Sequence, residues 1–562
     1  MKSKATVITF SAALIALLLF SCRSEKADVI YHNANIYTMS DELPVASAVA
    51  VKNGRFIFVG SNDDAFAYAG NNTNVIDLGG MTVIPGLTES HMHFEGLGRT
   101  LLKAPLDVYW LPLDQLLERI RIAAEEAEAG EWIIARGYND ALWDETPHKN
   151  LLDQVSPDNP VVLRRYCGHA HWVNTNALDI AGVEASTPDP DAGTIVKDDN
   201  GNPSGVLVSA AGALVNSHIP ESPGLSDEEE LQALKLGNDA LLEAGITTVH
   251  DLTATGRSDI ELRKRAYEEG LLSVRLMDAV DERTARELSQ PLRGLYDNRY
   301  TAGWVKMFVD GSLGGRGAAL FAPYSDMPGE TGALRALGQD QEAYAQVVAE
   351  LLTLGFSTRT HSIGDRGNHI TLNAFDRAME IAGISPEDAR LVVEHAQILH
   401  PDDIERFQGG RIIASMQPVH ATEDMLFAEE RIGQERASQG AYAWRKILDR
   451  GGIIAAGSDY GVSPFNPFYG LHAAVTRQDR ENNPPGGWLP EHGMTREEAL
   501  KAYTVWPAYL EFSETEKGSI RQGNYADFIV IDRDYFAIPA EDIHKIEVLR
   551  TVLGGNCLYI SE

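Results

Sequence analysis

Two histidines, His91 and His93, stand one residue apart at the end of an apolar run that begins at Val83. In a β-strand, residues i and i+2 point to the same side, so both imidazoles would face one point. Imidazole nitrogens are common ligands of divalent cations such as zinc. Two histidines on a solvated strand face would show the same spacing. The pair therefore predicts a metal site only if further ligands occur elsewhere in the chain.

Further ligand-type residues do occur, and each ends a β-rich run. His361 ends the run 357–361, His395 ends 391–395, and Asp459 ends 453–459. Taken singly, such a histidine is more often a hydrogen-bonded structural residue, and an aspartate after Gly-Ser is more often a helix N-cap. Ligand-type residues at several strand ends are much less expected by chance than one such residue at a single strand end. The set therefore favours a metal site.

The number of ligands bears on the number of metals. Four imidazoles and one carboxylate exceed what a four-coordinate zinc needs when a water must also bind. Lys306 lies in the run 304–308 and faces either the interior or the outer layer of the fold; a lone lysine in a strand is more often a surface charge. Bound metals would lower the pKa of water towards ~7 and polarise a substrate carbonyl. Asp459 could then accept a proton and pass it to the leaving group.

The elements that would position these residues alternate between helix and strand from Leu231 onward. Such alternation predicts βα units and a parallel sheet. Amphipathic patterns at 341–354 and 368–382 fit helices between the strands. With eight strands the fold class is α/β, a (β/α)8 TIM barrel whose active site lies at the carboxyl ends of the strands. The expected strands are the run before His91 and 246–250, 274–277, 305–308, 357–361, 391–395, 412–417 and 453–459.

Both chain ends are β-rich. Asn53-Gly54 joins two such runs, which is a strong hairpin signal, and 528–531 reads as a buried strand. Neither end has enough strands for a stable sheet, so we expect residues 28–84 and 517–562 to form one small β-sandwich. The barrel domain would then span 85–516. An inserted α+β subdomain is expected at about 100–240.

Residues 1–21 are predicted to be a lipoprotein signal peptide. Lys2 and Lys4 precede an apolar run that is short for a bilayer span, and the run ends in Leu-Phe-Ser-Cys, which resembles a bacterial lipobox. Cys22 would be lipidated, and 22–27 would tether an exported protein to a bacterial membrane, facing the periplasm or the surface. An ordinary signal peptide with an incidental cysteine, or an uncleaved anchor, is the alternative.

Composition limits the partners. The 562-residue chain carries a formal net charge of −33, which argues against nucleic acid because phosphate binding needs clustered Lys and Arg. Acidity of this kind serves solubility. Three cysteines do not make a disulfide framework. The expected partners are a small-molecule substrate and the membrane; the oligomeric state is open, and a homodimer is compatible with the sequence.

Motifs along nearly the whole mature chain resemble those of the amidohydrolase superfamily, and within it the amidohydrolase-3 (YtcJ-like) group. In the first motif the chain has Glu89 where the group usually carries Asp; this position precedes the ligands and should affect their support. The motifs are PGLTESHMH (85–93), GHAHWVN (168–174), AGITTVHD (244–251), VKMFVDGSLGGR (305–316), HSIGDRG (361–367), EHAQ (394–397), SMQP (415–418) and GSD (457–459).

The resemblance implies a barrel beside a β-sandwich and two divalent metal ions bridged by a carboxylated Lys306. Zinc is expected, although manganese, iron and cobalt fit similar ligands. Asp459 is implied as the metal-bound acid and base. The implied ligands are His91, His93, Lys306, His361, His395 and Asp459.

Further residues are candidates for substrate binding. For His169, a structural hydrogen bond is an equal alternative to substrate binding. Asp310 and Arg316 could line the pocket or pair with each other. Large aromatics such as Trp143 are more often core residues. The candidates are His169, Asp310, Arg316, Gln417, His420 and Trp143.

The leading functional hypothesis is hydrolysis of a non-peptide carbon–nitrogen bond in an amide, formamide or cyclic amide. Hydrolysis of a lactone or ester uses the same attacking hydroxide. A mononuclear aminohydrolase, which deaminates a heterocycle, needs fewer ligands. The orientation of Lys306 distinguishes the two, since a Lys306 that points into the mouth of the barrel favours two metals. A lipid-anchored binding protein without catalysis is the alternative from another class, since a fold alone does not decide function.

Overall fold

The computed structural model describes residues 25–102, 106–108, 111–140, 143, 145–165, 170–190, 193–219 and 225–561. The predicted signal peptide, the lipidation site Cys22 and the substrate-binding candidate His169 lie outside these residues. The chain divides into a larger unit, 1–94 with 238–562, and an inserted unit, 95–237. Within the described part of the chain, none of the helices has the length and apolarity that spanning a bilayer would take.

The larger unit is built on a parallel barrel, which confirms the predicted fold class. Among the described residues, eight parallel strands follow one another in the order β22-β21-β20-β19-β18-β16-β15-β8. A parallel bridge between Met92, at the end of β8, and Tyr460, in the segment after β22, closes the seam between the first and last strands. The strands are β8 (Leu87–Met92), β15 (Ile246–Thr255), β16 (Arg275–Val280), β18 (Tyr300–Phe308), β19 (Ser357–Ser362), β20 (Val392–His395), β21 (Ile413–Met416) and β22 (Ile454–Ala456).

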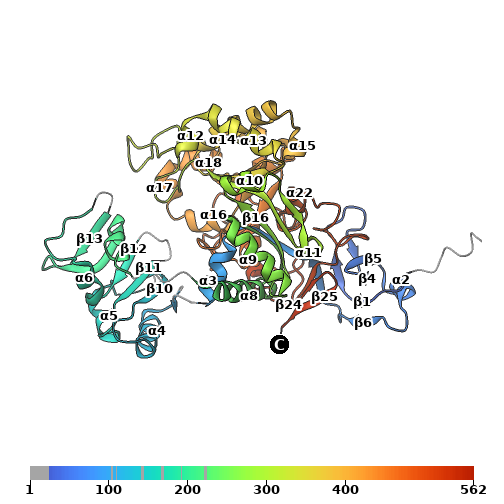
Figure 1. Ribbon diagram of the computed structural model, residues 1–562, viewed down its shortest axis with the longest axis horizontal. Helices are drawn as coiled ribbons and strands as arrows, with labels where there is room; N and C mark the ends of the chain where they lie inside the picture. The colour runs from blue at the N-terminus through green and yellow to red at the C-terminus, as the bar shows by residue number, and fades with distance from the viewer. Residues whose placement is uncertain are drawn as a thin grey trace, which may run out of the picture. The chain divides into compact units, whose positions relative to one another are not determined.

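The barrel strands form where short apolar runs are covered on both faces. Every residue of β8, β20, β21 and β22 is buried, as expected for parallel strands enclosed by helices. Helices follow the strands and surround them, as Figure 1 shows for α9, α10, α13 and α14. They include α9 (Arg257–Glu268), α10 (Glu282–Leu288), α13 (Gln341–Thr353), α14 (Asp365–Ala382), α16 (Pro418–Asp424), α20 (Pro467–Thr476), α21 (Arg496–Ala502) and α22 (Val505–Leu510).

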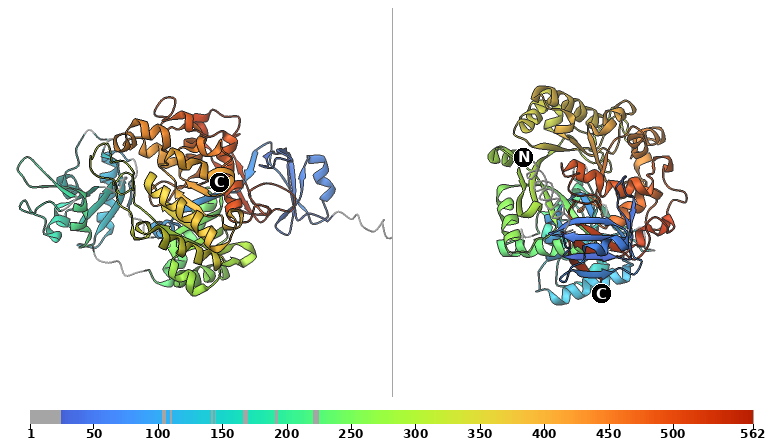
Figure 2. Two further views of the ribbon diagram at one scale, coloured as in Figure 1. Left: turned by 90° about the horizontal axis from the view of Figure 1, so that it is seen from above. Right: turned by 90° about the vertical axis from the view of Figure 1, so that its right-hand side faces the viewer.

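Strands from both chain ends build the β-sandwich of the larger unit. One sheet has the order β5-β4-β1-β6, and the other has the order β25-β24-β23-β7-β2-β3. In Figure 2 the blue N-terminal strands lie beside red C-terminal ones. The predicted Asn53-Gly54 turn joins β4 to β5 with positive φ at both residues. The strands are β1 (Val29–His32), β2 (Asn35–Tyr37), β3 (Val45–Ala46), β4 (Ala48–Lys52), β5 (Arg55–Gly60), β6 (Asn74–Asp77), β7 (Thr82–Pro85), β23 (Phe528–Ile531), β24 (Val548–Leu553) and β25 (Asn556–Ile560).

The inserted unit is an α+β fold with its own core. Its sheet has the order β13-β14-β12-β11-β10-β9, and the core includes Leu116, Ile120, Tyr138 and Trp172. Its elements include β9 (Leu106–Asp107), α4 (Leu113–Glu126), β10 (Ile133–Tyr138), α5 (Lys149–Val155), β11 (Val161–Arg165), β12 (Ala170–Val173), α6 (Thr175–Ala181), β13 (Gly193–Lys197) and β14 (Pro203–Ser209).

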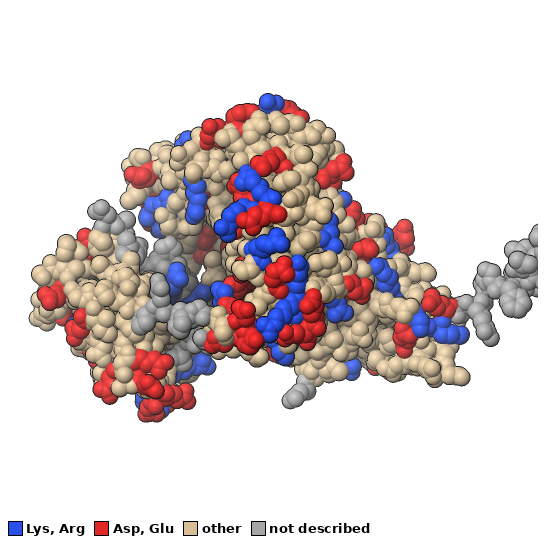
Figure 3. All heavy atoms as spheres, in the orientation of Figure 1, with Lys and Arg blue, Asp and Glu red and all other residues tan. Residues whose placement is uncertain are grey.

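The charged surface of the barrel helices is mixed. On the face shown in Figure 3, Lys and Arg lie among Asp and Glu. Arg265 of α9 pairs with Glu269 directly after that helix, and Arg286 of α10 pairs with Glu350 of α13.

Candidate active site

The predicted ligand residues come together at the carboxyl ends of the barrel strands. His91 lies in β8, Lys306 in β18, His361 in β19 and His395 at the end of β20, while Asp459 follows β22. This is the end of a TIM barrel where active sites are built.

Backbone hydrogen bonds hold the first and last strands together at this point. The Asp459 amide donates to the His91 carbonyl at 2.6 Å. Glu89 strengthens the seam because its Oε1 accepts from the Ser458 amide at 2.8 Å and from the His91 amide at 3.2 Å. Burial raises the pKa of Glu89 to about 8. Glu89 therefore supports two neighbouring site residues through their backbone.

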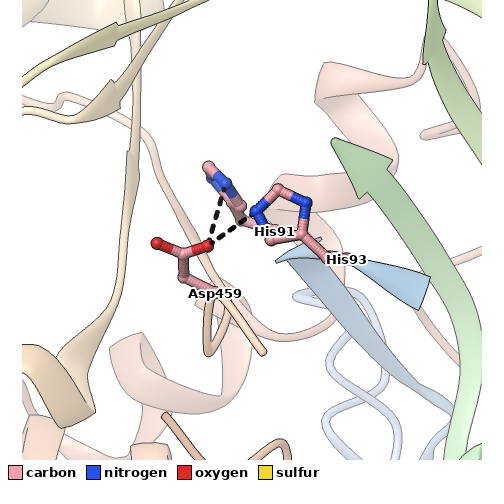
Figure 4. A group of neighbouring side chains, drawn as sticks. All are labelled: His91, His93 and Asp459. Carbon is pink, nitrogen blue, oxygen red and sulfur yellow. Dashed lines mark ion pairs between the residues drawn. The ribbon is translucent and has the colours of Figure 1, made fainter. Parts of the chain in front are cut away.

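Asp459 lies among imidazoles. Its Oδ1 is 3.3 Å from His93 Nε2 and 3.5 Å from His91 Nε2, as drawn in Figure 4. Burial opposes ionisation of Asp459, but the neighbouring His91, His93, His395 and His420 hold its pKa well below the ordinary value. Ligand atoms of His91, His93 and Asp459 all lie within 4.8 Å of one another. A carboxylate with two imidazoles is a donor set that suits a divalent cation.

Two residues of the site have backbone conformations that are rare for side chains with a Cβ atom. His395 has φ 72° and Asp459 has φ 55°. Left-handed conformations of this kind cost about 1–3 kcal/mol each and persist where the surroundings enforce them. At Asp459 the enforcing contacts include the bonds across the seam. The strain therefore lies at the residues that turn their side chains into the site.

Lys306 points into the barrel interior rather than the outer layer. Its Nζ is 3.3 Å from His91 Nε2, and the residue is only 6% exposed. Burial lowers the pKa of Lys306 to about 8. The geometry resolves the orientation that the sequence left open, and it places the amine beside a predicted ligand.

His361 lies next to His395, with 4.6 Å between the ring centroids. Its Nε2 has no hydrogen-bond partner among the described residues and is 3.8 Å from Asp310 Oδ1. Burial lowers the pKa of His361 to about 3. A buried, unpartnered imidazole nitrogen is an exception among folded proteins, and a metal ion would satisfy it.

A buried polar chain orients His91. The His91 Nδ1 donates to Glu394 Oε2, and Arg359 Nε donates to Glu394 Oε1. The three side chains are at most 1% exposed. A histidine that donates its far nitrogen to a carboxylate presents the other nitrogen to a metal in a fixed tautomer. His91 Nε2 is therefore directed towards the site.

The buried polar chain that begins at His91 continues from Arg359 through the barrel core. Arg359 Nη1 donates to His250 Nδ1 at 2.9 Å, and His250 Nε2 donates to Glu511 Oε1 at 2.8 Å. Glu511 in turn pairs with the buried Lys517. Breaking a buried ion pair costs about 3–5 kcal/mol because one charge is left unpaired. The far end of this polar chain, at Glu511 and Lys517, therefore contributes to the stability of the barrel.

Sequence reasoning missed this support. Glu394 and Arg359 are charged residues in otherwise uncharged predicted strands, and that oddity was the available signal. Their pairing depends on the strand order, since β19 and β20 are neighbours with His361 opposite Glu394.

The substrate-binding candidates have different surroundings. Asp310 does not pair with Arg316: its carboxylate accepts from the Ala319, Ile363 and Gly364 amides. Arg316 pairs with Asp326, with Nη2 and Oδ2 2.6 Å apart. The pairing that the sequence offered as an alternative is therefore wrong, because a backbone cradle takes up the Asp310 carboxylate.

Gln417 and His420 lie beside the site, whereas Trp143 belongs to the inserted unit. Gln417 Oε1 accepts from His395 Nδ1 at 2.8 Å. Trp143 stacks against Tyr138 at 5.8 Å, and its Nε1 donates to the Leu111 carbonyl at 3.1 Å. These contacts place Trp143 against the core of the inserted unit, which is the alternative to substrate binding that the sequence offered.

A parallel (β/α)8 barrel with histidine and aspartate side chains gathered at the carboxyl ends of its strands has the architecture of a metal-dependent hydrolase. The chain belongs to the amidohydrolase family, whose model matches residues 74–559. This confirms the resemblance that the motifs indicate.

Relatives match over almost the whole chain. The protein LONG AFTER FAR-RED 3 of Arabidopsis thaliana is 32% identical over 95% of this chain and 92% of its own length. YtcJ of Bacillus subtilis (strain 168) is 32% identical over 94% of this chain and 99% of its own. An N-substituted formamide deformylase of Arthrobacter pascens is 27% identical over 95% of this chain and 99% of its own.

A solved structure shares the fold. The crystal structure of an uncharacterized metal-dependent hydrolase from Pyrococcus furiosus aligns with a TM-score of 0.69 at 26% identity, covering 90% of this chain and 99% of the other. Family, fold and the clustered ligand atoms together identify a hydrolase with candidate metal-binding groups.

Proposed function

We propose that the protein hydrolyses a non-peptide carbon–nitrogen bond in an amide, a formamide or a cyclic amide. The observation that carries the proposal is the position of Asp459 between His91 and His93, 3.5 and 3.3 Å from their Nε2 atoms, with Lys306 beside His91. A buried carboxylate in this position is suited to move a proton between an attacking water and a leaving amine.

The metal site would use the residues that the barrel gathers. We propose two divalent ions, with zinc first among the metals to test, and a carboxylated Lys306 as the bridge between them. When bound, the ions would lower the pKa of water and polarise the substrate carbonyl. The proposed ligands are His91, His93, Lys306, His361, His395 and Asp459.

The chain's own residues supply the rest of the mechanism. Asp459 would accept the proton of the attacking water through a carboxylate oxygen and return it to the leaving nitrogen. Glu394 fixes the tautomer of His91, and Gln417 does the same for His395. The orientation of the ligands therefore comes from bonds that are present before any substrate binds.

N-substituted formamides are the first substrates to test, because a relative that matches 95% of this chain bears the name of an enzyme that deformylates them. Metal-loaded protein should release formate from a panel of N-alkyl and N-aryl formamides, or an acid from simple amides and cyclic amides. Asp459→Asn should not. Turnover confined to lactones or to heterocyclic amines would replace the carbon–nitrogen hydrolase by an ester hydrolase or a deaminase.

We also propose that the mature protein is a lipoprotein anchored at Cys22 and exported to the bacterial membrane. The proposal depends on the sequence of residues 1–27, where an apolar run ends in Leu-Phe-Ser-Cys.

A further inference from the structure

His420 lies next to a proposed metal ligand, His395. It is the third residue of α16, the helix that begins directly after β21 and Gln417. It is 9% exposed, and its ring lies 6.2 Å from that of His395 at an interplanar angle of 21°. The start of α16 therefore brings an imidazole to the rim of the proposed metal site.

The His420 ring has a nitrogen that nothing in the described protein satisfies. Nε2 is buried and has no hydrogen-bond partner among the described residues. Buried polar atoms in native proteins are normally paired, and an unpaired one calls for an explanation such as a bound ion. Two residues of metal-ligand type lie close to the His420 side chain.

Those neighbours are His395 and Asp459. Ligand atoms of His395, His420 and Asp459 all lie within 4.8 Å of one another, and the three residues are buried. His395 donates from Nδ1 to Gln417 Oε1 at 2.8 Å, which leaves its Nε2 as the ligand atom. Two imidazole nitrogens and a carboxylate oxygen form a donor set for zinc, manganese or cobalt.

We propose that His420 is a metal ligand, and that it holds a second metal position together with His395 and Asp459. This position adjoins the one formed by His91, His93 and Asp459, so Asp459 is common to both. The inference rests on the proposed metal-dependent hydrolase and adds His420 to the ligand set that the motifs imply. His361 is part of neither cluster, but it stays a proposed ligand because its buried Nε2 is also without a partner among the described residues.

Metal binding by the His420→Gln variant tests the proposal without any substrate. Metal-free wild-type and variant proteins are dialysed against graded zinc, and bound metal is measured by mass spectrometry. The variant should lose about one of two ions per chain. His369→Gln is the matched control, because His369 of α14 pairs with Asp403 away from the proposed ligands and the His369 side chain is 42% exposed. Equal stoichiometry and affinity in wild type and His420→Gln would overturn the proposal.

A second variant reports contact directly and guards against a folding defect in the first. His420→Cys keeps a metal-binding side chain, and a thiolate is a stronger ligand for soft and borderline metals. Loaded with cobalt(II), this variant should show a near-ultraviolet sulfur-to-cobalt charge-transfer band that wild type and His369→Cys lack. A cobalt-loaded His420→Cys protein without the band would contradict the assignment.

The two proposals fail in different ways. If wild-type protein binds no metal, both the hydrolase mechanism and the role of His420 fall. If wild type binds metal and hydrolyses amides while every residue-420 variant keeps its full metal content, only the His420 assignment falls. A loss of turnover without loss of metal would then make His420 a substrate contact, the role that the sequence suggests.

Discussion

The Asp459 amide and the His91 carbonyl are joined by a 2.6 Å hydrogen bond across the seam between the last and first barrel strands. The two side chains enter the site on either side of this bond, with His91 Nε2 and Asp459 Oδ1 3.5 Å apart. Closure of the barrel therefore brings His91 and Asp459 together in the site. A chain that failed to close its barrel would separate its proposed proton carrier from its first metal ligand.

Asp459→Asn should reduce turnover by about 10²–10⁴-fold or more, since the amide cannot accept a proton from water. His91→Asn should also abolish turnover because it removes a proposed ligand. Both variants should keep the circular dichroism spectrum of the wild type. Steady-state kinetics on the best formamide or amide substrate provides the measurement, and full activity in either variant would refute the mechanism.

Glu394→Gln should weaken metal binding by about 10–100-fold, the usual effect of removing a carboxylate behind a metal-binding histidine. The glutamine keeps the size of the side chain but loses the charge that holds His91 and Arg359. Competition with a chromogenic chelator measures the affinity.

Glu511→Gln is the control for this effect, because Glu511 lies at the other end of the same polar chain, beside His250 and Lys517. It should lower the free energy of unfolding while leaving the metal affinity close to that of the wild type. Equal metal affinities in Glu394→Gln and wild type would mean that Glu394 is structural only.

Much of the barrel was predictable because its parallel strands are short apolar runs buried on both faces. Each expected strand is present, and β23 spans the predicted 528–531. The convergence of His91, His361, His395 and Asp459 was predictable because the carboxyl ends of all the barrel strands lie at the same end of the barrel.

The support of the site was not predictable, because it depends on contacts between distant parts of the chain. Arg359 reaches His250 on another strand, and His250 reaches Glu511, which directly follows α22. The partner of Arg316 is Asp326 in the same long loop, whose course no periodicity describes. His420 was recognised as a candidate, but its distance from Asp459 depends on where α16 begins.

Asp527→Asn should destabilise the larger unit by about 3–5 kcal/mol, the cost of leaving a buried arginine unpaired. Asp527 directly precedes β23 of the sandwich, and its carboxylate pairs with Arg275 of the barrel strand β16 at 2.7 Å. Burial alone would raise the pKa of Asp527, but Arg275 holds it below the ordinary 3.8. Urea unfolding at pH 7 measures the difference.

The same pair predicts a pH effect. Because the folded pKa of Asp527 lies below its unfolded value, its contribution to stability is complete above about pH 4 and is lost as the pH falls through the folded pKa. Asp527→Asn should therefore flatten the decline of stability below pH 4. Asp402→Asn, at a side chain that is 92% exposed, is the control and should leave the decline unchanged.

Cys22→Ser should move the protein from the membrane fraction to the soluble fraction, because the serine cannot receive the lipid. Fractionation of cells that express the full chain, with labelling by a fatty-acid analogue, measures the change. Continued membrane attachment of the variant would count against lipidation at this residue.

The measurement that tests the central claim most directly is the metal content per chain of protein without residues 1–21, with Lys306→Ala alongside. The account predicts about two ions per wild-type chain under metal-replete conditions, and a lower content in Lys306→Ala, because Lys306 lies 3.3 Å from His91 Nε2. One ion, unchanged in the variant, would favour a mononuclear aminohydrolase. A wild-type protein that binds no metal would contradict the account and favour a non-catalytic binding protein.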